Sequence, residues 1–145
     1  MNEALHFIRA AIVTRLSGNI SSGGSNVPVY NRVPDNASEP YIKVYSVSSF
    51  EVDENQTSYH LDCTTRIEAV TAFEADAGGG LICEQITSSI INLLRTRSSG
   101  YYDLSDDGFT VYTSVVDNIR YLETDVKEKT YFRSIIDLSN KVQKS

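Results

Sequence analysis

The sequence predicts an α+β fold in which two amphipathic helices pack on one face of an antiparallel (mixed) β-sheet of four to five strands. Two segments carry apolar residues at three- and four-residue spacing, which is the helical period. Other segments alternate in polarity or are rich in β-branched and aromatic residues, and short polar links join them. The chain has 145 residues, so we expect residues 1–145 to form a single domain.

The first helix is expected at residues 2–17 and the second at about residues 76–97. Gly18 ends the first helix, and Gly100 follows the second. In each helix one face is apolar. The residues on these faces are Ala4, Leu5, Ile8, Ala11, Ile12 and Leu16 in the first helix, and Ile82, Ile86, Ile90, Leu93 and Leu94 in the second.

The segment between the first helix and the middle of the chain predicts a loop, a short edge strand and a long strand. Residues 19–26 are rich in Gly, Ser and Asn, which is typical of a loop. Residues 27–30 form a short extended piece, and Pro28 confines it to a sheet edge or a strand start because proline has no N–H to donate. Residues 41–51 predict a strand, and residues 51–58 an exposed polar loop.

Residues 59–69 form the clearest predicted strand because polarity alternates strictly along them. Such alternation predicts one buried face and one solvent-facing face. The residues expected to be buried are Tyr59, Leu61, Cys63, Thr65, Ile67 and Ala69. The residues expected on the open face are His60, Asp62, Thr64, Arg66 and Glu68.

The C-terminal part predicts a final pair of strands. Residues 101–108 read as a loop, residues 109–122 as a strand and residues 123–128 as a charged turn. The last strand is expected at residues 130–138, and residues 139–145 are expected to form a flexible polar tail.

The acidic composition, with a formal net charge of −6, disfavours a protein that grips nucleic acid. Tight phosphate binding needs a basic surface, whereas an acidic wall lets DNA slide past. No apolar run is long enough to cross a bilayer, and the N-terminus lacks a signal-peptide pattern. We therefore expect a protein that acts in a cytoplasm without contacting a membrane.

The residues capable of catalysis do not converge in the predicted fold. Cys63 points to the opposite face of its strand from His60 and Asp62, so these residues cannot form a catalytic triad. Cys63 and Cys83 are expected to be buried without a disulfide. No metal-binding spacing is present, and the glycines at 78–80 lack a phosphate-loop ending. We expect no enzyme, no metal and no cofactor.

The remaining signal is for interaction surfaces. The chain has nine tyrosines and no tryptophan, and tyrosine is enriched where a side chain is half buried at an interface. Tyrosine is also common inside β-strands, so we expect ordinary strand packing to explain about half of these tyrosines. The predicted interface residues are Tyr30, Arg32, Tyr41, Tyr45, Tyr59, His60 and Arg66. Acidic loops that could line a lumen or face a partner contain Glu51, Asp53, Glu54, Asp103, Asp106 and Asp107.

Residues 27–47, VPVYNRVPDNASEPYIKVYSV, resemble the diagnostic stretch of the tail completion (tail terminator) proteins of long-tailed bacteriophages. The matching positions are Val27, Val29, Tyr30, Val33, Pro34, Pro40 and Tyr41. The resemblance implies a mixed α/β domain that assembles as a ring, usually a hexamer. In that family the ring caps the tail tube, stops its polymerisation and offers a surface to the filled head.

The resemblance therefore implies a structural protein of the virion, placed in the neck of the tail and assembled in the host cytoplasm. The implied partners are further copies of the chain, the tail tube protein and a head–tail connector or stopper. Double-stranded DNA would pass through the lumen without sequence-specific binding. The alternatives are another neck component, such as a head completion or stopper protein, and a small enzyme or ligand-binding domain.

Overall fold

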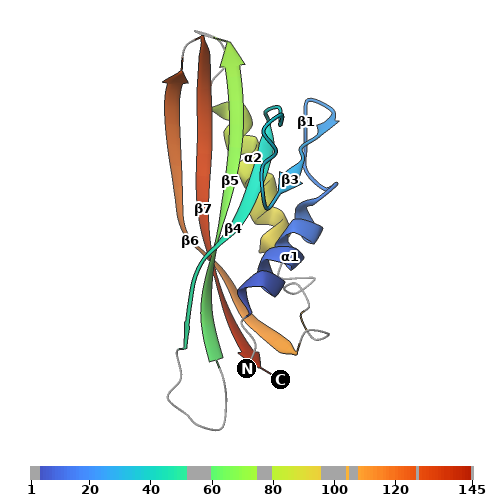
Figure 1. Ribbon diagram of the computed structural model, residues 1–145, viewed down its shortest axis with the longest axis vertical. Coiled ribbons are helices and arrows are strands. Elements are labelled where there is room, and N and C mark those ends of the chain that lie inside the picture. The colour runs from blue at the N-terminus through green and yellow to red at the C-terminus, as the bar shows by residue number, and fades with distance from the viewer. Residues whose placement is uncertain are drawn as a thin grey trace.

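The computed structural model describes residues 4–51, 60–74, 80–95, 104, 108–126 and 128–144 of the chain. Two helices and a five-stranded mixed sheet form an α+β fold, as predicted, and a two-stranded hairpin stands beside them (Figure 1). The elements in chain order are α1 (Leu5–Leu16), β1 (Ser21–Ser22), β2 (Ser25–Asn26), β3 (Val29–Tyr30), β4 (Tyr41–Glu51), β5 (His60–Glu74), α2 (Leu81–Leu94), β6 (Phe109–Val126) and β7 (Lys129–Lys144).

The large sheet has the strand order β3-β4-β5-β7-β6. All neighbours pair antiparallel except β3, which runs parallel to β4 and pairs with it at Ile42 and Lys43. β5 and β7 pair without interruption from His60 to Glu74. The three β-bulges of the sheet lie on β4, after Ser46, and on β6, after Val111 and Val116.

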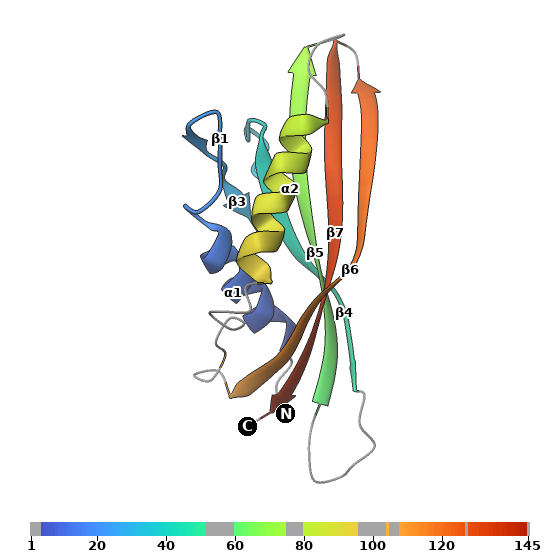
Figure 2. The same cartoon turned by 180° about the vertical axis from the view of Figure 1, so that it is seen from behind.

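Both helices pack on the same face of this sheet, and no described element covers the other face, called the uncovered face below (Figures 1 and 2). Most residues of the predicted apolar faces are buried, and Leu5, Ala11, Ile82 and Leu93 are partly buried against the core. Arg15 of α1 donates to the Leu93 carbonyl of α2. The fully buried side chains include Ile8, Ile12 and Leu16 of α1, Ile86 and Ile90 of α2, Ile42 of β4, Ile67 of β5, and Ile136 and Leu138 of β7.

The alternation along β5 is confirmed. Leu61, Cys63, Thr65, Ile67 and Ala69 are buried under the helices, whereas the residues between them are partly exposed on the uncovered face. The prediction for the thiols is also confirmed, since Cys63 and Cys83 are buried and form no disulfide.

The predicted polar tail at 139–145 is wrong as far as Lys144, because β7 continues to that residue. A polar residue can lie in a central strand when neighbouring strands satisfy it. Asn140 is fully buried, and its Nδ2 donates to the Thr113 carbonyl of β6 at 2.9 Å, whereas its Oδ1 has no hydrogen-bond partner among the described residues. Val142 is buried as well.

The predicted charged turn at 123–128 is also wrong, because β6 continues through Val126. Its last residues are exposed yet paired, with Glu123 opposite Phe132 and Thr124 opposite Tyr131. Polar side chains suit a strand that has solvent on one or both faces. In the predicted loop at 19–26, β1 and β2 form a small hairpin whose turn contains Gly23 and Gly24 at positive φ.

Candidate interaction surface on the uncovered face of the sheet

The uncovered face places residues of four strands in rows across the sheet, because directly paired residues point to the same face. One row joins Tyr45, Arg66, Asp137 and Asn118. The rows that follow toward the β6–β7 turn consist of Lys43, Glu68, Ile135 and Arg120, and of Tyr41, Val70, Arg133 and Leu122. We call the residues of these three rows the open-face patch.

Arg66 anchors the first row through a two-pronged ion pair with Asp137. Its Nε donates to Oδ1 at 2.7 Å and its Nη2 to Oδ2 at 3.4 Å. The hydrogen bond to Asp137, together with a second one to Tyr45, raises the pKa of the Arg66 guanidinium above its ordinary value. Arg66 is therefore permanently charged, and the planar geometry fixes its orientation on the sheet.

Two tyrosines frame the patch on the β4 side. The Lys43 ammonium lies 5.0 Å from the centre of the Tyr45 ring, which is a cation–π arrangement. The Tyr41 ring meets the Tyr30 ring edge-on, with 6.2 Å between centroids. Partial burial raises the pKa of both Tyr41 and Tyr45, and nearby Glu68 acts in the same direction. Both phenols therefore stay neutral and available for hydrogen bonds.

The centre of the patch is apolar although no helix covers it. Val70 is 4% exposed and Ile135 is 9% exposed. An apolar centre inside a polar and aromatic border is the usual anatomy of a protein interface.

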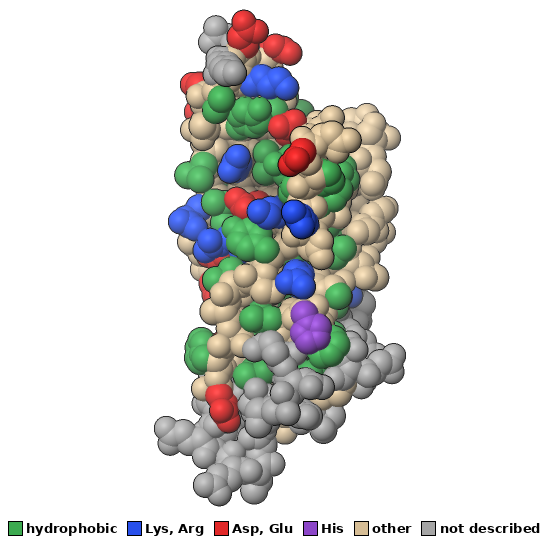
Figure 3. Space-filling view, viewed as in Figure 1, with side chains coloured by type: hydrophobic (Ala, Val, Ile, Leu, Met, Phe, Trp, Pro, Cys, Tyr) green, Lys and Arg blue, Asp and Glu red, His purple; other side chains and the backbone are tan. Residues whose placement is uncertain are grey.

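The patch is cationic on a chain that is acidic as a whole. Lys43, Arg66, Arg120 and Arg133 oppose only Glu68 and Asp137, whereas the chain carries a formal net charge of −6. Figure 3 shows Lys and Arg side chains lying among hydrophobic ones across the middle of this face. Such a surface attracts an anionic surface through complementary potentials.

The structure brings four of the predicted interface residues together in or beside this patch, namely Tyr30, Tyr41, Tyr45 and Arg66. Arg32 is exposed in the link after β3. His60 begins β5, six residues from Arg66, so it lies about 20 Å along the strand from that row. Tyr59 lies outside the described residues.

Among the acidic residues predicted to face a lumen or partner, Glu51 is the exposed last residue of β4. The other five lie outside the described residues. They are Asp53, Glu54, Asp103, Asp106 and Asp107.

Sequence reasoning missed Lys43, Arg120, Arg133 and Ile135 of the patch. The alternation around Tyr41 and Tyr45 already places Lys43 beside them, so that signal was available. Arg120 and Arg133 required the register between β6 and β7, which the sequence does not carry.

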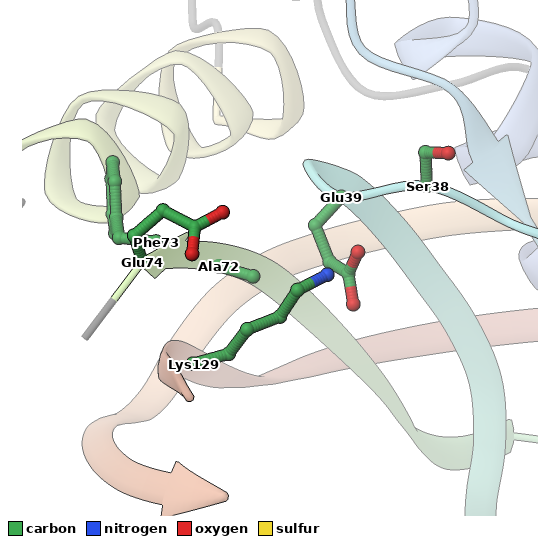
Figure 4. A pocket seen from close by; sticks show the side chains of 6 residues that line it. All are labelled: Ser38, Glu39, Ala72, Phe73, Glu74 and Lys129. Carbon is green, nitrogen blue, oxygen red and sulfur yellow. The ribbon is translucent and has the colours of Figure 1, made fainter. Parts of the chain in front are cut away.

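A separate pocket of about 390 Å³ opens where β5 and β7 extend past the start of β4. Lys129 points toward Glu39 across it, with Glu74 nearby (Figure 4). The lining is Ser38, Glu39, Ala72, Phe73, Glu74 and Lys129.

The described residues contain no group of three His, Cys, Asp or Glu side chains that could hold a metal ion. Burial raises the pKa of the Cys83 thiol, which favours the unreactive protonated form.

Comparison with known proteins gives no match to a protein-family model and none to a curated protein. Within the described residues, no helix is both long and apolar enough to span a membrane. The resemblance at residues 27–47 therefore rests on the sequence of those residues alone.

Proposed function

We propose that the protein is a non-enzymatic building block of a virion, a tail terminator that assembles as a ring, with six subunits as the expected number. The observation that carries the proposal is the open-face patch, a cationic and aromatic surface with an apolar centre that no other described element of the chain covers. The residues that resemble the tail completion family lie beside one end of the patch, because β3 pairs with the start of β4 and the Tyr30 ring contacts the Tyr41 ring.

The chemistry of the patch favours binding over catalysis. Arg66 is paired with Asp137, and the other charged groups lie in the same rows as Val70 and Ile135. Burying such a border against a complementary surface strengthens its electrostatics by excluding water. A ring subunit needs two different contact surfaces, one for each neighbour, and the patch supplies one.

The mechanism is geometric. One surface of the ring would bind the end of the tail tube and stop its growth, and the other would receive a head–tail connector or stopper. Double-stranded DNA would pass through the middle without specific contacts, which agrees with the acidic composition. The protein would be assembled in the host cytoplasm and retained in the neck of the virion. A head completion or stopper protein would use a surface of the same kind at another position in the neck.

The test is a charge reversal inside the patch with a matched control outside it. Arg133→Glu changes an exposed residue of the patch, whereas Lys141→Glu makes the same change on β7 opposite Asp62 and outside the three rows. We expect Arg133→Glu to raise the concentration needed for ring assembly about tenfold, because it places a negative charge against the anionic surface that the patch is proposed to bind. Light scattering measures the assembled mass, and circular dichroism checks that both variants are folded.

Equal assembly of the two folded variants would contradict a role for the patch. The position of the protein in the virion is tested by immunogold labelling of assembled particles. Label at the head-proximal end of the tail tube supports the tail terminator, and label on the head side of the neck supports a head completion or stopper protein.

A further inference from the structure

A pocket of about 160 Å³ lies beside the end of β6 on the helix face, which is the face of the sheet that carries the helices. Cys83 of α2, Tyr121 of β6 and Phe132 of β7 line it with apolar groups. Tyr121 belongs to this face because it pairs with Ser134, which is hydrogen-bonded to Thr87 of α2. An apolar cavity of about 150 Å³ can hold a benzene-sized group. The pocket therefore has room for one apolar side chain.

The rim of the pocket is acidic. Glu84 stands in the first turn of α2, and Glu123 pairs with Phe132, so its side chain lies on the same face. Both glutamates are exposed. α2 lies beside the end of β6 without covering it, so another molecule can approach from the margin of the sheet (Figure 2). An apolar pocket with two carboxylates at its rim suits an apolar side chain flanked by cations.

The opposite face of the same strand end carries such a side chain. Leu122, in the open-face patch, is 49% exposed. It pairs with Arg133, and Arg120 is its neighbour on the same face of β6; both arginines are exposed. We call Leu122 with these two arginines the plug. The other aliphatic side chains of the patch, Val70 and Ile135, are buried and cannot enter a pocket.

Other exposed apolar side chains on the uncovered face suit the pocket less well. Phe50 pairs with Asp62, whose carboxylate would be repelled by an acidic rim. Val126 is smaller and pairs with a single cation, Lys129. Leu122 therefore matches the pocket in both size and charge.

We propose that the plug of one copy inserts into the pocket of the next copy, so that its two arginines face Glu84 and Glu123 at the rim. This inference rests on the proposed ring and names the anionic surface that the open-face patch binds. Plug and pocket lie on opposite faces of one strand end, so a single rigid neighbour cannot occupy both. Each contact leaves one plug and one pocket for further copies, which is the head-to-tail pattern that builds a ring.

The test reverses the charges of each half of the contact. The pocket variant carries Glu84→Arg and Glu123→Arg, and the plug variant carries Arg120→Glu and Arg133→Glu. Alone, each places like charges against one another, and we expect each to raise the concentration for half-assembly about tenfold. In an equimolar mixture, contacts between the two variants join opposite charges, whichever copy supplies the plug. The mixture should therefore assemble at the wild-type concentration.

Matched controls make the same changes of charge outside the contact. Glu74→Arg with Glu128→Arg alters two exposed carboxylates, and Lys129→Glu with Lys141→Glu alters two exposed ammonium groups of β7. Circular dichroism checks that every variant is folded, and both controls should assemble like the wild type. A control as defective as its counterpart would assign the effect to net charge and overturn the contact.

The apolar part of the contact is tested separately. Leu122→Ser removes the group that fills the pocket and should raise the concentration for half-assembly about tenfold. Val115→Ser is the control, because Val115 is similarly exposed on the same face of β6 but lies outside the plug. A Leu122→Ser variant that assembles as well as Val115→Ser would overturn the insertion.

Two defective variants whose mixture assembles support the contact. Folded variants that assemble like the wild type, or a mixture that stays defective, would overturn it while leaving the ring in place. A pocket variant that forms rings but no longer binds purified tail tubes would assign the pocket to the tube protein and would also overturn it. A wild-type protein that never assembles, even on purified tail tubes, would overturn the proposed function instead.

Discussion

The central strands and the outer strands of this sheet differ in regularity and exposure. β5 and β7 pair from end to end without a bulge, and their helix-facing side chains are buried, among them Ile67 and Leu138. β4 and β6 contain the three bulges of the sheet and carry its exposed apolar side chains. The centre of the sheet is therefore regular and buried, whereas β4 and β6 are irregular and exposed.

The difference has a physical basis. A central strand has hydrogen-bonding neighbours on both sides, so its register is strongly determined by the buried face. An outer strand has one neighbour, and a bulge there increases local twist at the cost of one unpaired residue. Val47 and Asp117 occupy such positions.

The largest effect is expected on removing residues 139–145. If β7 ended at Leu138, as the sequence suggested, this deletion would change little. Because Asn140 and Val142 are buried between β5 and β6, we expect the shortened chain to lose cooperative folding. Far-ultraviolet circular dichroism during heating measures this, with removal of Ser145 alone as the control. A shortened chain that melts like the full one would contradict the central role of β7.

The next effect compares the same substitution at the centre and at the edge. Ile67→Ala on β5 opens a cavity at a fully buried site and should lower the free energy of unfolding by about 2–5 kcal/mol. Ile119→Ala on β6 removes a half-buried side chain and should cost about 1 kcal/mol. Urea denaturation gives both values. Equal losses would mean that the edge stabilises the fold as much as the centre does.

The smallest effect concerns the tyrosines at the border of the open-face patch. Burial raises the pKa of Tyr41 and Tyr45 in the folded protein, so the unfolded chain loses these phenol protons first as pH rises. Their contribution to stability is complete below the unfolded pKa of about 10 and is lost above it. We expect the free energy of unfolding to fall more steeply above that pH in the wild type than in a Tyr41→Phe, Tyr45→Phe variant. Identical slopes would contradict the effect of burial.

The sequence predicted the fold where one physical signal dominated. The alternation along residues 59–69 and the helical spacing around Ile86 and Ile90 reflect burial on one face, which composition records directly. The predictions for Ser139–Lys144 and Glu123–Val126 were wrong. A polar segment in a paired strand has the same composition as a loop, and the sequence does not show which strand it pairs with.

The candidate surface was predicted in part for the same reason. Tyr41, Tyr45 and Arg66 can be identified from alternation within single strands. Arg120 and Arg133 join them only through the register of β6, β7 and β5, which depends on pairing between distant segments. The bare edges were not predicted at all, since strand order decides which strands are outermost.

The most direct test of the central claim is the mass and shape of the assembled protein. Light scattering and negative-stain imaging would follow the wild type over a concentration series, alone and with purified tail tubes. The account predicts a closed ring with a mass that is a multiple of 16.1 kDa and a pore wide enough for duplex DNA. A particle that keeps the mass of one chain at every concentration, and that leaves the ends of the tubes bare, would contradict it.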